Sequence, residues 1–156
     1  MKAVILAAGR GVRLGEDDHP KCLTVLETGE TILGRQWECL KRHVPAKDVW
    51  VVVGYKKEMI MEAFPHFHYV HNDDYHKENT SKSLLKAIKN IDDTVLWING
   101  DVVFHPSILE LLLKKSMTSM IVNRSSVGEE EIKYTLSSDG TIQELSKTVK
   151  NGLGEA

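Results

Sequence analysis

Two glycines and two cations lie close together near the start of the chain. Gly9 and Gly11 follow an apolar run, and Arg13 and Lys21 follow the glycines. Glycine has no Cβ, so its backbone can approach a ligand closely, and successive N–H groups in such a turn form an anion-binding concavity. The guanidinium and ammonium groups add fixed positive charge suited to phosphate oxygens. This stretch therefore predicts a loop that binds the phosphates of a nucleotide.

Two common phosphate loops do not fit this stretch. A P-loop requires the string G-x-x-x-x-G-K-[ST], which the sequence lacks. A dinucleotide fingerprint requires a third glycine where this chain has Leu14, and a ribose-binding acid where it has Gly54. The simpler alternative is a tight turn after a buried strand.

Asp101 is the second residue suited to chemistry. It follows the apolar run 95–98 through Asn99 and Gly100, so its carboxylate is expected at the carboxyl end of a strand. Mg²⁺ favours one or two carboxylates together with substrate phosphates. The alternative is that Asp101 caps the helix expected to begin near Pro106.

Other polar residues have simpler interpretations. Thr80 or Ser81 is suited to cap a helix that runs to about residue 91. The histidines at 66, 68 and 71 have no Cys or acidic partner at zinc spacing, so a metal role is disfavoured. Cys22 adjoins Lys21, but adjacent side chains of an extended segment point opposite ways, so an inert thiol is expected.

Alternating strand and helix patterns must position these residues. Alternation of this kind implies βαβ units with a mainly parallel sheet, in which ligands sit at the carboxyl ends of the strands. That rule places the Gly9–Arg13 loop, the Asn72–Thr80 loop and Asp101 on one edge. The expected strands are 3–8, 48–53, 68–71, 94–98 and 117–122; the helices are 32–43, 55–64, 80–91 and 107–115; 22–26 is extended, and a hairpin joins 132–136 to 141–145.

Length and composition bound the class of protein. The chain has 156 residues, 42% hydrophobic and 27% charged, which suits one globular domain. A net charge of −2 gives no bulk basic surface for nucleic acid, and no apolar run approaches a membrane span. The first residues already form a strand, which leaves no room for a signal peptide, and the two cysteines form no disulfide framework. A cytoplasmic location is expected.

The glycine stretch resembles a known family. Leu6-Ala7-Ala8-Gly9-Arg10-Gly11-Val12-Arg13-Leu14 followed by Pro20-Lys21 matches the pattern L-A-A-G-x-G-x-R-L then P-K. That pattern is typical of nucleotidyltransferases that make sugar nucleotides and CDP-alcohols. Two further strings, Pro20-Lys21-Cys22-Leu23 and the N-x-x-x-S-L element at 79–84, resemble the phosphocholine, inositol-phosphate and aminoethylphosphonate cytidylyltransferases. Lys82 departs from that branch, where a small or aromatic residue is usual, so the base stays open.

The resemblance implies a fold and a set of site residues. The fold is a three-layer, Rossmann-like α/β sandwich with a mainly parallel sheet, as a single domain over residues 1–156 whose C-terminal acceptor part is missing. Arg13, Lys21 and Asp101 are the implied catalytic residues, and Asp101 the ligand of Mg²⁺. Lys147, in a Glu-Leu-Ser-Lys segment, is a candidate phosphate contact or an ordinary solvated lysine. The implied nucleotide-binding residues are Leu6, Ala8, Gly9, Gly11, Arg13, Lys21, Asn79, Ser83 and Asp101.

These parts suit nucleotidyl transfer. A phosphate monoester is nearly dianionic at neutral pH, because its second pKa is about 6. It is therefore already a nucleophile and requires no general base. The expected partners are an NTP, with CTP favoured, and a small phosphorylated alcohol or phosphonate. Transfer from another NTP to a sugar 1-phosphate, and a nucleotide-binding module without turnover, remain alternatives. An uncovered sheet edge makes a homo-oligomer possible.

Overall fold

Two compact units make up the structure, a computed structural model that describes residues 1–10, 19–124, 128, 131–149 and 151–155. The first unit is Met1–Phe104 and the second is His105–Ala156. The single domain expected over residues 1–156 stays a prediction.

A parallel four-stranded sheet forms the centre of the first unit. Its strand order is β3-β2-β1-β4, and each neighbouring pair is parallel. The carboxyl ends of all four strands therefore lie at one edge. The strands are β1 (Lys2–Ala7), β2 (Val49–Val53), β3 (His68–His71) and β4 (Val95–Asn99); the helices are α1 (Ile32–Leu40), α2 (Lys57–Ala63) and α3 (Thr80–Ile88), with short 3₁₀ turns η2 (Lys21–Leu23) and η3 (Ala46–Asp48).

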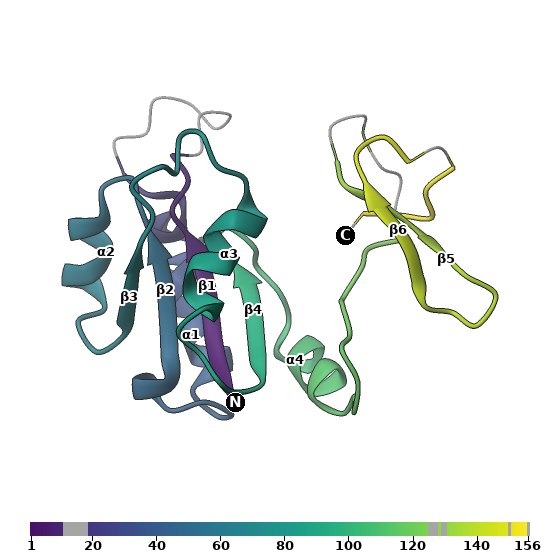
Figure 1. Cartoon of the computed structure of the whole chain (residues 1–156). Coiled ribbons are helices and arrows are strands. Elements are labelled where there is room, and N and C mark those ends of the chain that lie inside the picture. The colour runs from purple at the N-terminus through teal and green to yellow at the C-terminus, as the bar shows by residue number, and fades with distance from the viewer. Residues whose placement is uncertain (11–18, 125–127, 129–130, 150, 156) are drawn as a thin grey trace. The chain divides into compact units, whose positions relative to one another are not determined.

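Both faces of this sheet are covered by helices. Helix α3 lies on one face and α1 on the other (Figure 1). Ala87 of α3 packs with Val4 and Val52 in a buried cluster. On the opposite face Tyr69, which is in register with Val51, donates its hydroxyl hydrogen to the Phe64 carbonyl oxygen at the end of α2. The layering is that of a three-layer α/β fold, as expected.

Burial on both faces explains the sequence of the central strands. Ile5 and Val51 are fully buried, as are Val4 and Val52, which point to the other face. A strand with two buried faces shows a continuous apolar run rather than alternation. This is why β1 and β2 are recognisable from sequence.

Two local expectations in the first unit are wrong. Residues 21–23 form the turn η2 instead of an extended segment: Pro20 precedes it, and the Leu23 N–H donates to the Pro20 carbonyl oxygen. Helix α3 is capped by Asn79, one residue before the predicted Thr80 or Ser81, because the Asn79 side chain accepts a hydrogen bond from the Lys82 N–H.

The described residues of the second unit form a helix and a hairpin. Helix α4 (Pro106–Leu113) begins with proline, and β5 (Lys133–Leu136) pairs antiparallel with β6 (Ile142–Ser146). Gly140 has a φ of +82°, the left-handed conformation that hairpin turns require, so the hairpin prediction is confirmed.

The prediction of a strand at 117–122 is wrong. No residue of that segment pairs with a strand of the described chain, and the next residue, Asn123, forms only an isolated bridge with Glu155. Met117 is 70% exposed. An apolar run has strand propensity, but a strand also needs a partner for its backbone groups.

Within the described residues, none of the helices combines the length and apolar character needed to cross a membrane.

Candidate functional site

The carboxyl edge of the sheet brings together the loops that follow β1, β2 and β4. The Tyr55 N–H donates to the Ala8 carbonyl oxygen at 3.0 Å, and the Gly100 N–H donates to the Leu6 carbonyl oxygen at 2.9 Å. Leu6 and Ala8 therefore connect the glycine loop to both neighbouring strands through their main chains. Their direct contact with a nucleotide stays a prediction.

Two glycines that the sequence analysis did not select make this edge compact. A Cβ at Gly54 would lie 2.7 Å from the Tyr75 ring and 2.8 Å from the Ala8 carbonyl oxygen. A Cβ at Gly100 would lie 2.8 Å from the Leu6 carbonyl oxygen. Each glycine directly follows a strand, and this position in the sequence is a signal that could have identified both.

The glycine loop itself is described only in part. Gly11 and Arg13 lie outside the described residues, so their predicted roles are not examined by the structure. Gly9 is described, and a Cβ built on it meets no heavy atom of the described residues within 4 Å. The contact of Gly9 with a phosphate stays a prediction.

Lys21 and Asp101, both predicted catalytic residues, lie together. The Lys21 Nζ is 3.8 Å from Asp101 Oδ2, and the two side chains are 24% and 52% exposed. Asp101 does not cap α4, the alternative that the sequence left open. The N-cap of that helix is His105, whose Nδ1 accepts from the Ser107 N–H.

Asp101 fits Mg²⁺ as a single carboxylate ligand. Its side chain is half exposed, and among the described residues its only partner is Lys21 at a long distance, so its oxygens can reach a cation. The described residues contain no cluster of three or more His, Cys, Asp or Glu side chains that could hold a metal alone. Mg²⁺ is commonly bound in this way, by one or two carboxylates and the phosphates of a substrate.

Asn79 and Ser83, both predicted to bind nucleotide, form structural hydrogen bonds around α3. Asn79 caps the helix, and the Ser83 hydroxyl oxygen accepts from the fully buried Asn72 amide at 2.9 Å. Lys86 donates to the Asn72 Oδ1 at 2.7 Å and pairs with Glu78 at 2.8 Å. The hydrogen bond from Lys86 is the main cause that lowers the pKa of Glu78. These bonds hold the loop after β3; a nucleotide contact by Asn79 or Ser83 stays a prediction.

Aromatic and cationic side chains from three loops gather at the same edge. The Tyr55 and Tyr75 ring centroids lie 6.4 Å apart, and the Arg10 guanidinium lies 5.6 Å from the Tyr55 centroid. Sequence reasoning did not select these residues, because isolated tyrosines in loops carry no spacing signal.

Cys22 is buried, and its thiol is held protonated. The pKa of Cys22 is raised to about 12, chiefly by burial; a backbone hydrogen bond lowers it, and the Asp101 carboxylate makes a smaller contribution that raises it. The expectation of an inert thiol agrees with this environment, although the chain here is a 3₁₀ turn and not extended.

Lys147 belongs to the second unit, where it is exposed in a turn after β6. Its predicted phosphate contact stays a prediction. Of the three histidines weighed as zinc ligands, His68 stacks on Trp50 with centroids 4.9 Å apart, and the His71 Nδ1 lies 3.4 Å from the Lys57 Nζ.

A doubly wound α/β sheet with a glycine loop, a lysine and an aspartate at its carboxyl edge defines a protein of the nucleotide-binding class. Comparison with known families identifies it further. The chain belongs to the family of MobA-like NTP transferase domains, which its residues 3–151 match.

Individual relatives share the sequence and the fold. A CMP-5'-(3-aminopropyl)phosphonate synthase from Streptomyces rubellomurinus is 38% identical over 120 residues, covering 72% of this chain and 19% of the relative. A bifunctional protein GlmU from Methanococcus maripaludis is 33% identical over 141 residues, covering 86% of this chain and 33% of the relative.

Among solved structures, the CTP:phosphocholine cytidylyltransferase from Streptococcus pneumoniae superposes with a TM-score of 0.67 at 25% identity, covering 92% of this chain and 63% of that protein. The chain spans 19% of the length of the phosphonate synthase and 33% of the length of GlmU.

Proposed function

We propose that this chain catalyses transfer of a nucleotidyl group, CMP from CTP, to a small phosphorylated alcohol or a phosphonate, with release of pyrophosphate. The observation that carries the proposal is the Lys21–Asp101 pair at the carboxyl edge of the sheet. An ammonium group and a carboxylate at one point can serve a reaction between two anions: the first binds phosphate oxygens and the second binds a cation.

The reaction needs little covalent chemistry from the protein. An oxygen of the acceptor phosphate or phosphonate forms a bond to the α-phosphorus of the nucleotide, and the bond from that phosphorus to the bridging oxygen breaks. The electron pair leaves with pyrophosphate. The acceptor is already an anion, so the protein must hold two anionic reactants together and neutralise charge as it shifts.

Each proposed residue has one task in this scheme. The backbone at Gly9 and Gly11, with Arg13, holds the β- and γ-phosphates. Lys21 lies between the α-phosphate and the acceptor and stabilises the charge of both. Asp101 would hold Mg²⁺, which would supply charge neutralisation and polarisation of the α-phosphate. Asn79 and Ser83 contribute to the nucleotide site by fixing the loop after β3, and Lys147 is a candidate contact to the phosphates.

The choice of CTP rests on the relatives. One is named for a CMP–phosphonate product and the structural neighbour for CTP and phosphocholine. A second candidate is transfer from another NTP to a sugar 1-phosphate. It is retained because another relative, GlmU, is not named for cytidylyl transfer, and because the glycine-loop pattern also occurs in enzymes that make sugar nucleotides.

Pyrophosphate release tests the proposal. The full chain is incubated with Mg²⁺ and each of CTP, UTP, GTP and ATP, and with phosphocholine, 3-aminopropylphosphonate or glucose 1-phosphate as acceptor. We expect release with CTP and one of the first two acceptors, and none from Lys21→Ala. Release only with glucose 1-phosphate would establish the second candidate. Nucleotide binding in a thermal-shift assay without any release of pyrophosphate would indicate a nucleotide-binding module without turnover.

A further inference from the structure

Gln36 is a buried polar residue on the apolar face of α1. It is 1% exposed, and its neighbours along that face, Leu33 and Leu40, are fully buried. A buried amide is costly unless its hydrogen-bonding groups are paired. The partners of this side chain therefore need to be identified.

Both hydrogens of the Gln36 amide are used on one turn of the chain. The Nε2 atom donates to the Asn99 carbonyl oxygen at 2.9 Å and to the Val102 carbonyl oxygen at 2.7 Å. Both partners are carbonyl oxygens, which only accept, so the NH₂ group and not the amide oxygen must face them. Gln36 thus bridges the two residues that flank Gly100 and Asp101.

The same turn is held from a second side by β1. The Gly100 N–H donates to the Leu6 carbonyl oxygen at 2.9 Å, and the Val102 N–H closes the turn on the Asn99 carbonyl oxygen at 3.3 Å. Gly100 fits against β1 only because it lacks a Cβ. The backbone that carries Asp101 is therefore fixed by Gln36 of α1 on one side and by β1 on the other.

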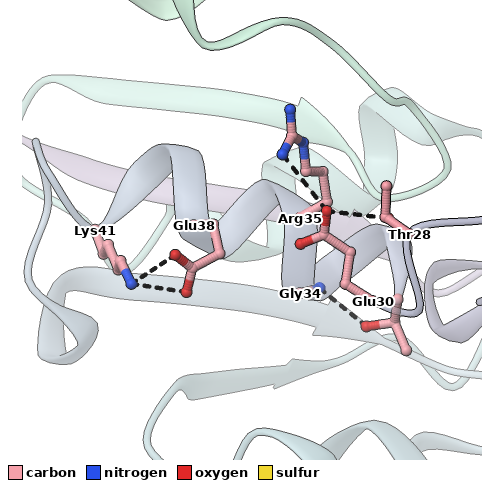
Figure 2. Close-up of polar contacts among 7 residues, drawn as sticks. Thr28, Glu30, Gly34, Arg35, Glu38 and Lys41 are labelled. Carbon is pink, nitrogen blue, oxygen red and sulfur yellow. Dashed lines mark hydrogen bonds and ion pairs between the residues drawn. The ribbon is translucent and has the colours of Figure 1, made fainter. Parts of the chain in front are cut away.

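The rotation of α1 about its axis is itself fixed, which directs Gln36. At its start the Thr31 hydroxyl oxygen accepts from the Gly34 N–H at 3.0 Å. On its exposed side Arg35 pairs with Glu30 and Lys41 pairs with Glu38, as Figure 2 shows. The exposed pairs contribute little, and the buried leucines decide which face of α1 meets the sheet; Gln36 lies on that face, directed at the turn.

We infer that Gln36 is a positioning residue that fixes the Asp101 carboxylate for binding the divalent cation. This inference rests on the proposed function, in which Asp101 is the metal ligand. Gln36 touches neither nucleotide nor cation; it acts through the two carbonyl groups beside Asp101. Outer groups that orient a metal ligand typically change metal affinity about 10–100-fold when they are lost.

The test replaces Gln36 by methionine, which has a similar volume and no donor. Two quantities are measured: the dissociation constant for Mn²⁺, by electron paramagnetic resonance with a non-hydrolysable CTP analogue, and the Mg²⁺ concentration that gives half the maximal rate. We expect both to rise about tenfold, while binding of the CTP analogue in EDTA stays unchanged. Gln36→Asn, which withdraws the same amide by one methylene, is the second variant if the first does not fold.

Two control variants separate positioning from stability. Leu40→Ala removes a fully buried side chain from the same helix and should lower the melting temperature without moving either metal measurement. Gln143→Met changes an exposed glutamine of β6 and should change nothing. The inference is overturned if Gln36→Met lowers the melting temperature as Leu40→Ala does and leaves Mn²⁺ binding unchanged. If Asp101→Asn leaves Mn²⁺ binding unchanged, the metal assignment fails instead, whatever Gln36 does.

Discussion

Lys21 Nζ lies 3.8 Å from Asp101 Oδ2, although the elements from α1 to β4 separate the two residues in the sequence. Both side chains keep contact with solvent, so the pair contributes little to stability. At about 4 Å in water such a pair is worth about 1 kcal/mol. In the proposed function Lys21 binds phosphate oxygens and Asp101 binds the divalent cation, so each side chain would exchange this contact for one with a ligand.

Lys21→Met should separate these two effects. Removing the ammonium group should abolish transfer, because a charge-assisted contact to phosphate is lost. It should also tighten Mn²⁺ binding in the absence of nucleotide, by up to about fivefold, because Asp101 loses a competing cation. Titration with Mn²⁺ and the pyrophosphate assay measure the two effects. Lys41→Met, which breaks the exposed pair with Glu38 in Figure 2, should do neither. Normal turnover by Lys21→Met would remove Lys21 from the site.

Asp101→Asn should weaken metal-dependent nucleotide binding more than metal-free binding. The amide keeps the shape of the carboxylate but lacks the charge that Mg²⁺ prefers. Calorimetry with the CTP analogue, in Mg²⁺ and in EDTA, compares the two conditions. An equal loss in both would mean that Asp101 serves the structure of the turn and not the cation.

Cys22 should make stability depend on pH in the alkaline range. Its pKa is raised from 9.0 to about 12 by burial, so the folded chain keeps a proton that the unfolded chain releases above pH 9. The contribution is fully present below pH 9 and is lost as the pH rises toward 12, with a slope of at most about 1.4 kcal/mol per pH unit. Denaturant unfolding between pH 8 and 10.5 should show a steeper loss for the natural chain than for Cys22→Ala. Parallel curves would refute the buried, protonated thiol.

The parallel sheet and the place of Asp101 at its carboxyl edge could be predicted because they follow from strong rules, whereas the approach of Lys21 to Asp101 was not predicted, since Lys21 lies in a turn that no strand rule positions. Strands buried on both faces give continuous apolar runs, and parallel strands bring their carboxyl ends to one edge. Gln36 could not be assigned, since its partners are main-chain carbonyl groups far along the chain that no side-chain pattern reveals. The prediction of a strand at 117–122 failed for a related reason. Its residues suit a strand, but a strand depends on a partner that local sequence does not specify.

Substitutions of Asn79 can separate its role as a helix cap from its proposed contact with the nucleotide. Its side chain accepts from the Lys82 N–H at 3.1 Å and from the Ser81 hydroxyl at 2.9 Å. Asn79→Ala should cost about 1 kcal/mol of stability, and Asn79→Ser, which can still cap, much less. We expect both variants to lose nucleotide affinity if the amide itself binds the ligand. If only Asn79→Ala loses affinity, in proportion to its lost stability, Asn79 acts solely by capping α3.

Gly9 and Gly100 should respond in opposite ways to the same substitution. A Cβ at Gly9 meets none of the described heavy atoms within 4 Å, and its φ is not positive, so Gly9→Ala should fold normally and gain up to about 1 kcal/mol through a less flexible unfolded chain. It should nevertheless lose nucleotide affinity, because the new methyl group occupies the space that phosphates need.

A Cβ at Gly100 meets the Leu6 carbonyl oxygen at 2.8 Å, so Gly100→Ala should cost about 1 to 3 kcal/mol and disturb the Asp101 turn. Urea unfolding measures the stability of each variant, and titration with the CTP analogue measures its affinity. Unchanged affinity in a stable Gly9→Ala protein would show that the ligand does not approach this backbone, and the phosphate site would then have to be sought elsewhere along the carboxyl edge of the sheet.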